Sequence, residues 1–141
     1  TIGDPNVYST FGYLAATVTS LLRDVSVETV PGITAMQALA AASGVPLAEG
    51  AEPLTLLPLA RSLDGLDEAL AGPGTVVLYK GGRHLAAVTA AIEATGRDAV
   101  YGEHVGLPHE KVGPLSEVDG TAPYMATVIA PPHRTVRGGK L

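Results

Sequence analysis

The feature that most constrains the fold is a pair of turns, near the start of the chain, that each lead from a strand into a helix. Residues 1–10 are typical of a strand end that runs into a Gly3-Asp4-Pro5 loop. Gly3 lets a ligand approach the backbone closely, Asp4 offers a carboxylate that accepts hydrogen bonds, and Pro5 fixes the turn. Apolar residues then recur at the spacing of an amphipathic helix, at Phe11, Leu14, Val18, Leu21 and Leu22.

A second turn of the same kind follows. Residues 25–30 alternate like a strand, and Pro31-Gly32 leads into a second apolar helix that carries Met36, Leu39 and Ala40. In open α/β sheets, ligands bind at the carboxyl ends of strands, and the amides at helix starts favour anions and hydrogen-bond acceptors. Two such loops side by side therefore predict a small-molecule site in an α/β fold.

The rest of the chain predicts a second domain. Gly44, Pro46, Gly50 and Pro53 end the second helix and indicate a linker. We therefore expect an amino-terminal part over residues 1–48 and a carboxy-terminal α/β domain over residues 49–141. Its pattern predicts strands at 54–59 and 75–80, helices at 63–70 and 83–95, and then consecutive short strands at 98–105, 110–118 and 124–130. That order favours a mixed sheet with an antiparallel end.

Composition excludes several classes of protein. A net charge of −5, with scattered basic residues, argues against a nucleic-acid partner. The absence of cysteine excludes disulfides and thiolate metal sites, and no apolar run reaches the roughly 18 residues needed to cross a membrane. A chain with 46% hydrophobic and 16% charged residues has apolar faces left over for a partner surface.

Catalytic side chains are not evident. The sequence has no nucleotide-binding glycine motif, no serine nucleophile elbow and no zinc-protease motif. The histidines, at positions 84, 104, 109 and 133, form no metal-ligand spacing, so we expect no metal site and leave the catalytic residues unknown. His104 stands out slightly within an apolar strand, where a histidine that has found its hydrogen-bond partner is the simplest interpretation.

Three segments together resemble a known family. Residues 2–8 (Ile-Gly-Asp-Pro-Asn-Val-Tyr), 30–35 (Val-Pro-Gly-Ile-Thr-Ala) and 76–81 (Val-Val-Leu-Tyr-Lys-Gly) resemble, in order and spacing, the S-adenosylmethionine motifs of the tetrapyrrole (corrin and porphyrin) methyltransferases. The resemblance implies a two-domain α/β methylase fold of which this chain is the latter part, truncated at its amino terminus. It also implies a cytoplasmic homodimer that methylates a tetrapyrrole of cobalamin biosynthesis, precorrin-2, at C(20).

The resemblance also implies roles for single residues. The cofactor S-adenosylmethionine would contact Ile2, Gly3, Asp4, Val7, Thr34, Ala35, Lys80 and Gly113. Lys80 departs from the Met that many relatives carry there. Early corrin precursors bear many carboxylates, so cations at the rim of the site are expected. Arg83 and His84 are the expected substrate residues, and Arg134, Arg137 and Lys140 are weaker candidates.

Methyl transfer needs little catalytic equipment. The sulfonium cofactor brings its own electrophile and leaving group, so that a protein mainly has to align the reactants and exclude water. Two alternatives stay open: a methylase of another corrin or porphyrin position, and a non-catalytic binding module that retains the fold. We expect residues 1–141 alone to be inactive.

Overall fold

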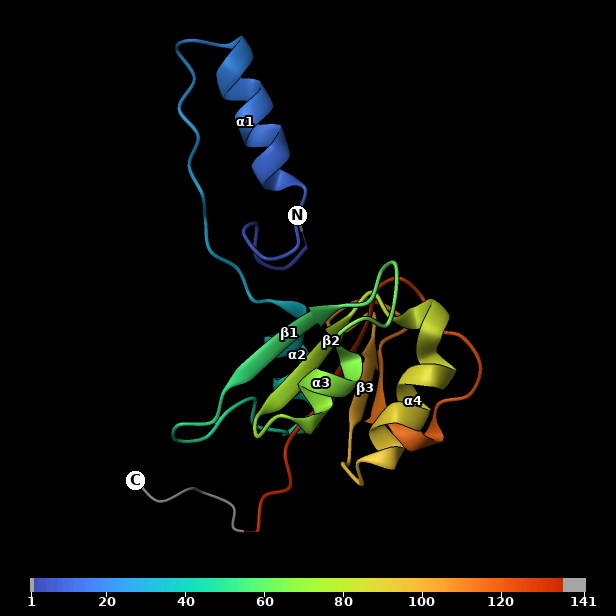
Figure 1. Cartoon of the computed structure of the whole chain (residues 1–141). Helices are drawn as coiled ribbons and strands as arrows, with labels where there is room; N and C mark the ends of the chain where they lie inside the picture. The colour runs from blue at the N-terminus through green and yellow to red at the C-terminus, as the bar shows by residue number, and fades with distance from the viewer. Residues whose placement is uncertain (1, 136–141) are drawn as a thin grey trace. The chain divides into compact units, whose positions relative to one another are not determined.

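The structure is a computed structural model in which residues 2–135 are described (Figure 1). The chain forms two compact units, Thr1–Ala35 and Met36–Leu141. Helix α2 (Ala35–Ser43) packs with the second unit, since its Leu39 is fully buried against Val77, Tyr79 and Ile129. The domain boundary that we expect between residues 48 and 49 stays a prediction.

The second unit is built on a five-stranded sheet with the order β1-β2-β5-β3-β4. Strands β1 (Leu54–Pro58) and β2 (Thr75–Tyr79) are parallel. Strands β5 (Ala126–Ala130), β3 (Val100–Glu103) and β4 (Lys111–Pro114) add to them through antiparallel pairings. The predicted α/β fold, with a mixed sheet that ends antiparallel, is confirmed.

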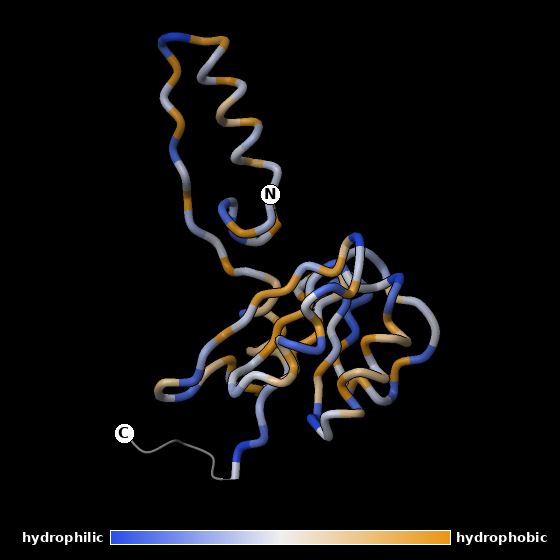
Figure 2. The backbone as a smooth tube through the Cα atoms, viewed as in Figure 1, coloured by the Kyte–Doolittle hydropathy of each residue, from blue (hydrophilic) through white to orange (hydrophobic). Residues whose placement is uncertain are grey.

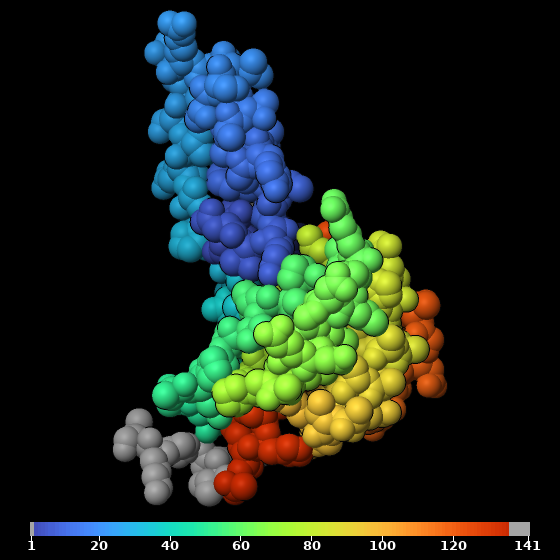
Figure 3. Space-filling view, in the orientation of Figure 1, coloured from blue at the N-terminus to red at the C-terminus, as the bar shows by residue number. Residues whose placement is uncertain are grey.

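Helices cover both faces of this sheet. Helix α3 (Leu66–Ala71) and helix α4 (Leu85–Ala94), which follows the short 3₁₀ turn Gly82–His84, lie side by side on one face (Figure 3). Helix α2 packs on the other face. In β2, Val76 and Leu78 join the α3/α4 core while Val77 and Tyr79 join the α2 core, which is the alternation that a pleated strand requires. The resulting apolar strands are visible in Figure 2.

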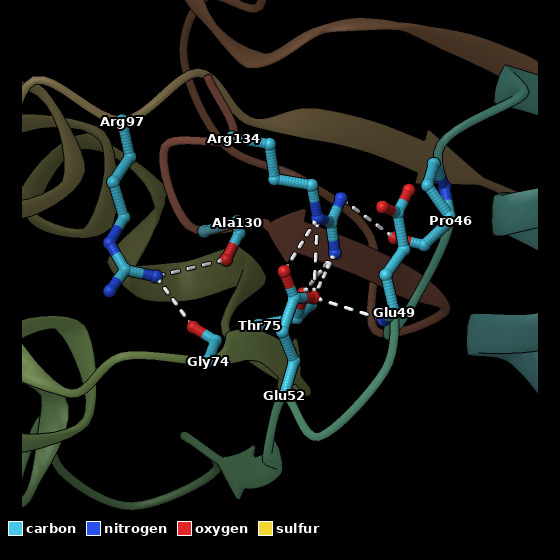
Figure 4. Close-up of polar contacts among 8 residues, drawn as sticks. All are labelled: Pro46, Glu49, Glu52, Gly74, Thr75, Arg97, Ala130 and Arg134. Carbon is cyan, nitrogen blue, oxygen red and sulfur yellow. Dashed lines mark hydrogen bonds and ion pairs between the residues drawn. The ribbon is translucent and has the colours of Figure 1, made fainter. Parts of the chain in front are cut away.

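Two arginines fasten the amino end of β2 (Figure 4). Arg97 donates hydrogen bonds to the carbonyl oxygens of Gly72 (2.5 Å), Gly74 (2.8 Å) and Ala130 (3.3 Å). Arg134 pairs with the Glu52 carboxylate at 2.6 Å and reaches the Thr75 hydroxyl at 3.4 Å. Arg134 was a weaker candidate for substrate contact in the sequence. In the structure it holds Glu52 against the first residue of β2, at the opposite end of this strand from Lys80. Arg137 and Lys140 lie outside the described residues.

The first unit contains helix α1 (Phe11–Leu21), which covers most of the apolar positions of the predicted helix and buries no side chain. Apolar residues recur along it (Figure 2), and Leu14, Leu21 and Leu22 are each more than half exposed. The strand predicted at residues 25–30 is wrong: the segment forms no strand in the part of the chain that the structure describes. Alternation of apolar and polar residues shows only that a segment is able to form a strand. The strand itself also needs a neighbouring strand that pairs with its backbone hydrogen-bonding groups.

Gly102 in β3 determines how closely α2 can approach the sheet. A Cβ atom there would lie 2.5 Å from Leu39 Cδ1 and 2.8 Å from Val105 Cγ2. Because Leu39 is fully buried and cannot move aside freely, we expect Gly102→Ala to destabilise the protein by about 1–2 kcal/mol, a typical cost of overpacking. Gly113→Ala, in the adjacent strand, meets no atom within 4 Å and serves as the matched control. Denaturant unfolding of the two variants measures the difference, and equal losses would contradict this account.

Candidate functional site

The two predicted ligand loops of the first unit lie directly against each other. Gly3 has a φ of +82°, a conformation that glycine adopts without strain. A Cβ atom on Gly32 would overlap the Gly3 carbonyl oxygen and lie 3.4 Å from the Asp4 Cα atom. The loops therefore touch through their backbones, and only glycine at position 32 permits this approach.

The Asp4 carboxylate joins the two loops. Its Oδ2 accepts a hydrogen bond from the Gly32 amide at 2.9 Å, and its Oδ1 accepts one from the Asn6 amide at 2.8 Å. These two hydrogen bonds, first the one from the Gly32 amide and then the one from the Asn6 amide, lower the pKa of Asp4 below its ordinary value of 3.8. Each carboxylate oxygen thus serves the loop architecture, a role that the bare Gly-Asp-Pro motif did not reveal.

The other predicted cofactor residues of this unit belong to the same two loops or follow them directly in the sequence. Ile2 is 70% exposed, Val7 is half-buried, and the Val7 amide closes the turn by donating to the Asp4 carbonyl at 3.3 Å. Thr34 is buried, and Ala35, the first residue of α2, is exposed. The structure thus brings Gly3 and Asp4 against the loop that carries Thr34.

In the second unit, Lys80 follows the carboxyl end of β2. The Leu59 amide donates to the Tyr79 carbonyl at 2.8 Å, which extends the parallel pairing up to that point. Lys80 has a φ of +61°, which is uncommon for a residue with a side chain, and its Nζ lies 5.5 Å from the centroid of the Tyr124 ring. The preceding residue, Tyr79, uses its hydroxyl to accept a hydrogen bond from the Met36 amide in α2 at 3.2 Å.

Arg83 and His84 lie in the 3₁₀ turn directly after Lys80. Arg83 is exposed. His84 is half-buried, and its Nε2 is buried with no hydrogen-bond partner among residues 2–135. The turn therefore presents Arg83 outward while part of the His84 ring points into the protein.

Gly113 does not join this group. The register aligns it with Tyr101 in β3, Val128 in β5 and Leu78 in β2, so three strand spacings of about 4.8 Å separate Gly113 from β2. Its neighbourhood is a shallow hollow beside β4 that Glu103, Lys111 and Glu117 also line. The structure thus brings Lys80, Arg83 and His84 together and leaves Gly113 apart from them.

The sequence reasoning missed a chain of polar contacts at the end of β3, which links the buried residues Tyr101 and Glu103 to the exposed Lys111. The Tyr101 hydroxyl donates to Glu103 Oε2 at 2.5 Å, and Lys111 Nζ lies 2.8 Å from Glu103 Oε1. The Lys111 contact, with help from Tyr101, lowers the pKa of Glu103, and burial raises that of Tyr101. The only sequence signal was a Glu in an otherwise apolar strand.

His104 departs from its simplest interpretation. It lies just beyond β3 with a φ of +52°, and its Nδ1 is buried with no hydrogen-bond partner in the described chain. Among the same residues, no group of three or more His, Cys, Asp or Glu side chains is arranged to hold a metal ion. None of the helices within residues 2–135 is long and apolar enough to cross a membrane.

Comparison with known proteins agrees with this architecture. Residues 1–119 match the family model described as Tetrapyrrole (Corrin/Porphyrin) Methylases. The chain is 34% identical, over 132 residues, to a precorrin-2 C(20)-methyltransferase of Sinorhizobium sp, and the match covers 92% of this chain and 53% of that protein. The chain thus spans about half the length of this relative.

Solved structures share the fold. The crystal structure of the cobalamin biosynthetic enzyme cobalt precorrin-4 methyltransferase, CbiF, matches with a TM-score of 0.68 and 22% identity, over 92% of this chain and 61% of that one. Uroporphyrin-III C-methyltransferase from Thermus thermophilus, complexed with S-adenosylhomocysteine, matches with a TM-score of 0.63 and 23% identity, over 92% and 62%. At these identities the likeness establishes the fold.

Proposed function

The chain belongs to the tetrapyrrole (corrin/porphyrin) methylase family, and we propose that it is part of an S-adenosylmethionine-dependent methyltransferase. We propose precorrin-2 as the substrate and C(20) as the methylated position, which gives precorrin-3A in cobalamin biosynthesis. The name of the Sinorhizobium relative, 34% identical over nearly the whole chain, supports this choice. The main structural support for the proposal is that the loops around Gly3 and Gly32 pack against each other through their backbones.

The residues of the first unit fit a sulfonium nucleoside. Ile2 and Ile33 expose apolar side chains, 70% and 69% respectively, beside the two loops. The glycines keep the backbone open, so that carbonyl and amide groups can meet a ligand that carries both donors and acceptors. We therefore propose that Ile2, Gly3, Asp4, Val7, Thr34 and Ala35 contact the cofactor, and that Asp4 also holds the two loops together.

The cofactor would supply an activated methyl group, so the chain's own residues have to bind, orient and shield the reactants. Lys80 and Arg83 offer positive charge beside the carboxyl end of β2, where carboxylates of a tetrapyrrole can pair with them. Lys80 and Gly113 also remain proposed cofactor contacts, and His84 a proposed substrate contact. The exposed leucines Leu14 and Leu21 of α1 support the proposal of a homodimer.

The Asp4 contacts give a test with a worked pH dependence. We expect Asp4→Ala, in the full-length protein, to weaken S-adenosylhomocysteine binding several-fold, because the Gly32 and Asn6 amides lose their acceptor. The folded-state pKa of Asp4 is lowered, so its contribution to stability is fully present above the ordinary value of 3.8 and is lost as the pH falls through the folded value.

Calorimetric titration of wild type and Asp4→Ala at pH 7 measures the affinity for S-adenosylhomocysteine. Thermal unfolding of both proteins from pH 7 to pH 3 measures how the stability contributed by Asp4 depends on pH. The difference in melting temperature between the two should stay constant down to about pH 5 and shrink only near and below pH 4. A difference that disappears by pH 6 would show that Asp4 is not an ionised bridge. Absence of cofactor binding to the wild type would defeat the proposed function itself.

A further inference from the structure

A tight turn presents two exposed side chains at the carboxyl end of β2. The Ala126 amide donates to the Pro123 carbonyl at 3.1 Å, which closes a turn with Tyr124 and Met125 at its centre. Tyr124 is 70% exposed and Met125 is 41% exposed, directly before the buried strand β5. A hydrogen-bonded turn anchored to a core strand holds these side chains in a defined place.

Backbone contacts fasten this turn to the basic loop that follows β2. The Ala122 amide donates to the Gly82 carbonyl at 3.2 Å. A Cβ atom on Gly82 would overlap the Ala122 carbonyl oxygen, so the two segments approach as closely as only glycine allows. Residues 80–84 and 121–125 therefore form one continuous surface, which we call the basic–aromatic edge.

Charge and shape of this edge suit one class of ligand. Lys80 Nζ lies 5.5 Å from the centroid of the Tyr124 ring, within range of a cation–π interaction, which helps to hold the ring. Arg83 adds a second, exposed cation. An exposed aromatic face beside two cations complements a flat, conjugated ring system that bears carboxylates around its rim.

We propose that Tyr124 is a substrate-contact residue of the methyltransferase, whose ring packs on the tetrapyrrole macrocycle while Lys80 and Arg83 pair with its carboxylates. This inference rests on the proposed function and deepens it by naming the aromatic platform. Lys80 has a second role in it as a positioning residue for the Tyr124 ring. The sequence pattern had placed Tyr124 at the start of the strand predicted over residues 124–130, and it offered no other signal for this residue.

The test uses the full-length enzyme with precorrin-2. Tyr124→Ala should raise the KM for precorrin-2 about tenfold, the loss expected for an aromatic contact, while the Kd for S-adenosylhomocysteine stays within about twofold. Tyr124→Phe keeps the ring and should retain a nearly wild-type KM. Tyr13→Ala removes a tyrosine that is 79% exposed on α1, and serves as the matched control with an unchanged KM.

Four outcomes separate the explanations. A raised KM in Tyr124→Ala that Tyr124→Phe restores supports the platform. An unchanged KM in an active Tyr124→Ala enzyme overturns it, and so does a loss confined to cofactor affinity. Melting temperatures show whether each variant is folded, and Tyr124→Gln replaces the alanine variant if that one is not. A wild type that neither binds the cofactor nor methylates precorrin-2 would instead refute the proposed function.

Discussion

Replacing Gly32 by alanine is expected to lower the affinity of the full-length protein for S-adenosylhomocysteine by a factor of about 10 or more. The new Cβ atom would overlap the Gly3 carbonyl oxygen and lie 3.1 Å from the Gly3 carbonyl carbon, so the two loops must separate. Forcing extra atoms into a closely packed site costs about 1–3 kcal/mol, which corresponds to this change in affinity. Separation also breaks the hydrogen bond from the Gly32 amide to Asp4.

Gly12→Ala provides the matched control for this experiment. Gly12 lies in helix α1 of the same unit, and a Cβ atom there meets nothing within 4 Å. Alanine is a better helix former than glycine, so this variant should keep the wild-type affinity and a wild-type or slightly higher melting temperature. Isothermal titration calorimetry measures both variants. Equal affinities in Gly32→Ala and wild type would show that the backbone-packed loops are not the cofactor site.

Removal of the Arg97 side chain is expected to cost about 2–3 kcal/mol of unfolding free energy. The guanidinium donates to three backbone carbonyl oxygens, of Gly72, Gly74 and Ala130, and hydrogen bonds from a charged donor contribute about 1.5–3 kcal/mol each when well formed. The expected loss is smaller than the sum of three such hydrogen bonds, because the Arg97 side chain is partly exposed and its contact to Ala130 is long, at 3.3 Å. Burial lowers the pKa of Arg97 but leaves an arginine charged.

The variants Arg97→Ala, Arg97→Lys and Arg61→Ala, compared by urea unfolding, test this clamp. Lysine cannot reach three carbonyls with a planar fork and should recover only part of the loss. Arg61 is exposed, and its removal should change stability by less than about 0.5 kcal/mol. If Arg97→Ala is as stable as Arg61→Ala, the clamp at the amino end of β2 does not stabilise the fold.

The sequence predicted the sheet well, because each strand and helix of the second unit carries its own apolar pattern. Thr75–Tyr79 is buried along its whole length, as a continuous apolar run indicates, and the short strands near the end of the chain gave the antiparallel pairings. The strand expected at residues 25–30 failed for the opposite reason. Its alternation is local, whereas strand formation depends on a partner that the pattern does not contain.

The candidate site could be predicted only in part. Glycines and prolines marked the loops, and the order of three motifs pointed to the family that the comparisons show. Contacts between segments far apart in the sequence could not be predicted from it. The hydrogen bond between Asp4 and Gly32 joins residues 28 positions apart, and the one between Tyr79 and Met36 joins residues 43 positions apart. Nor could sequence spacing show that Gly113 lies three strands away from β2.

Methyl transfer by the full-length protein tests the proposed function most directly. Purified enzyme, supplied with precorrin-2 and S-adenosylmethionine that carries a ¹³C-labelled methyl group, should yield a product heavier by one labelled methyl. Carbon NMR should place that label at C(20). Label at another ring carbon would contradict the proposed position, and a protein that transfers no methyl group to precorrin-2 or to other tetrapyrroles would contradict the account as a whole.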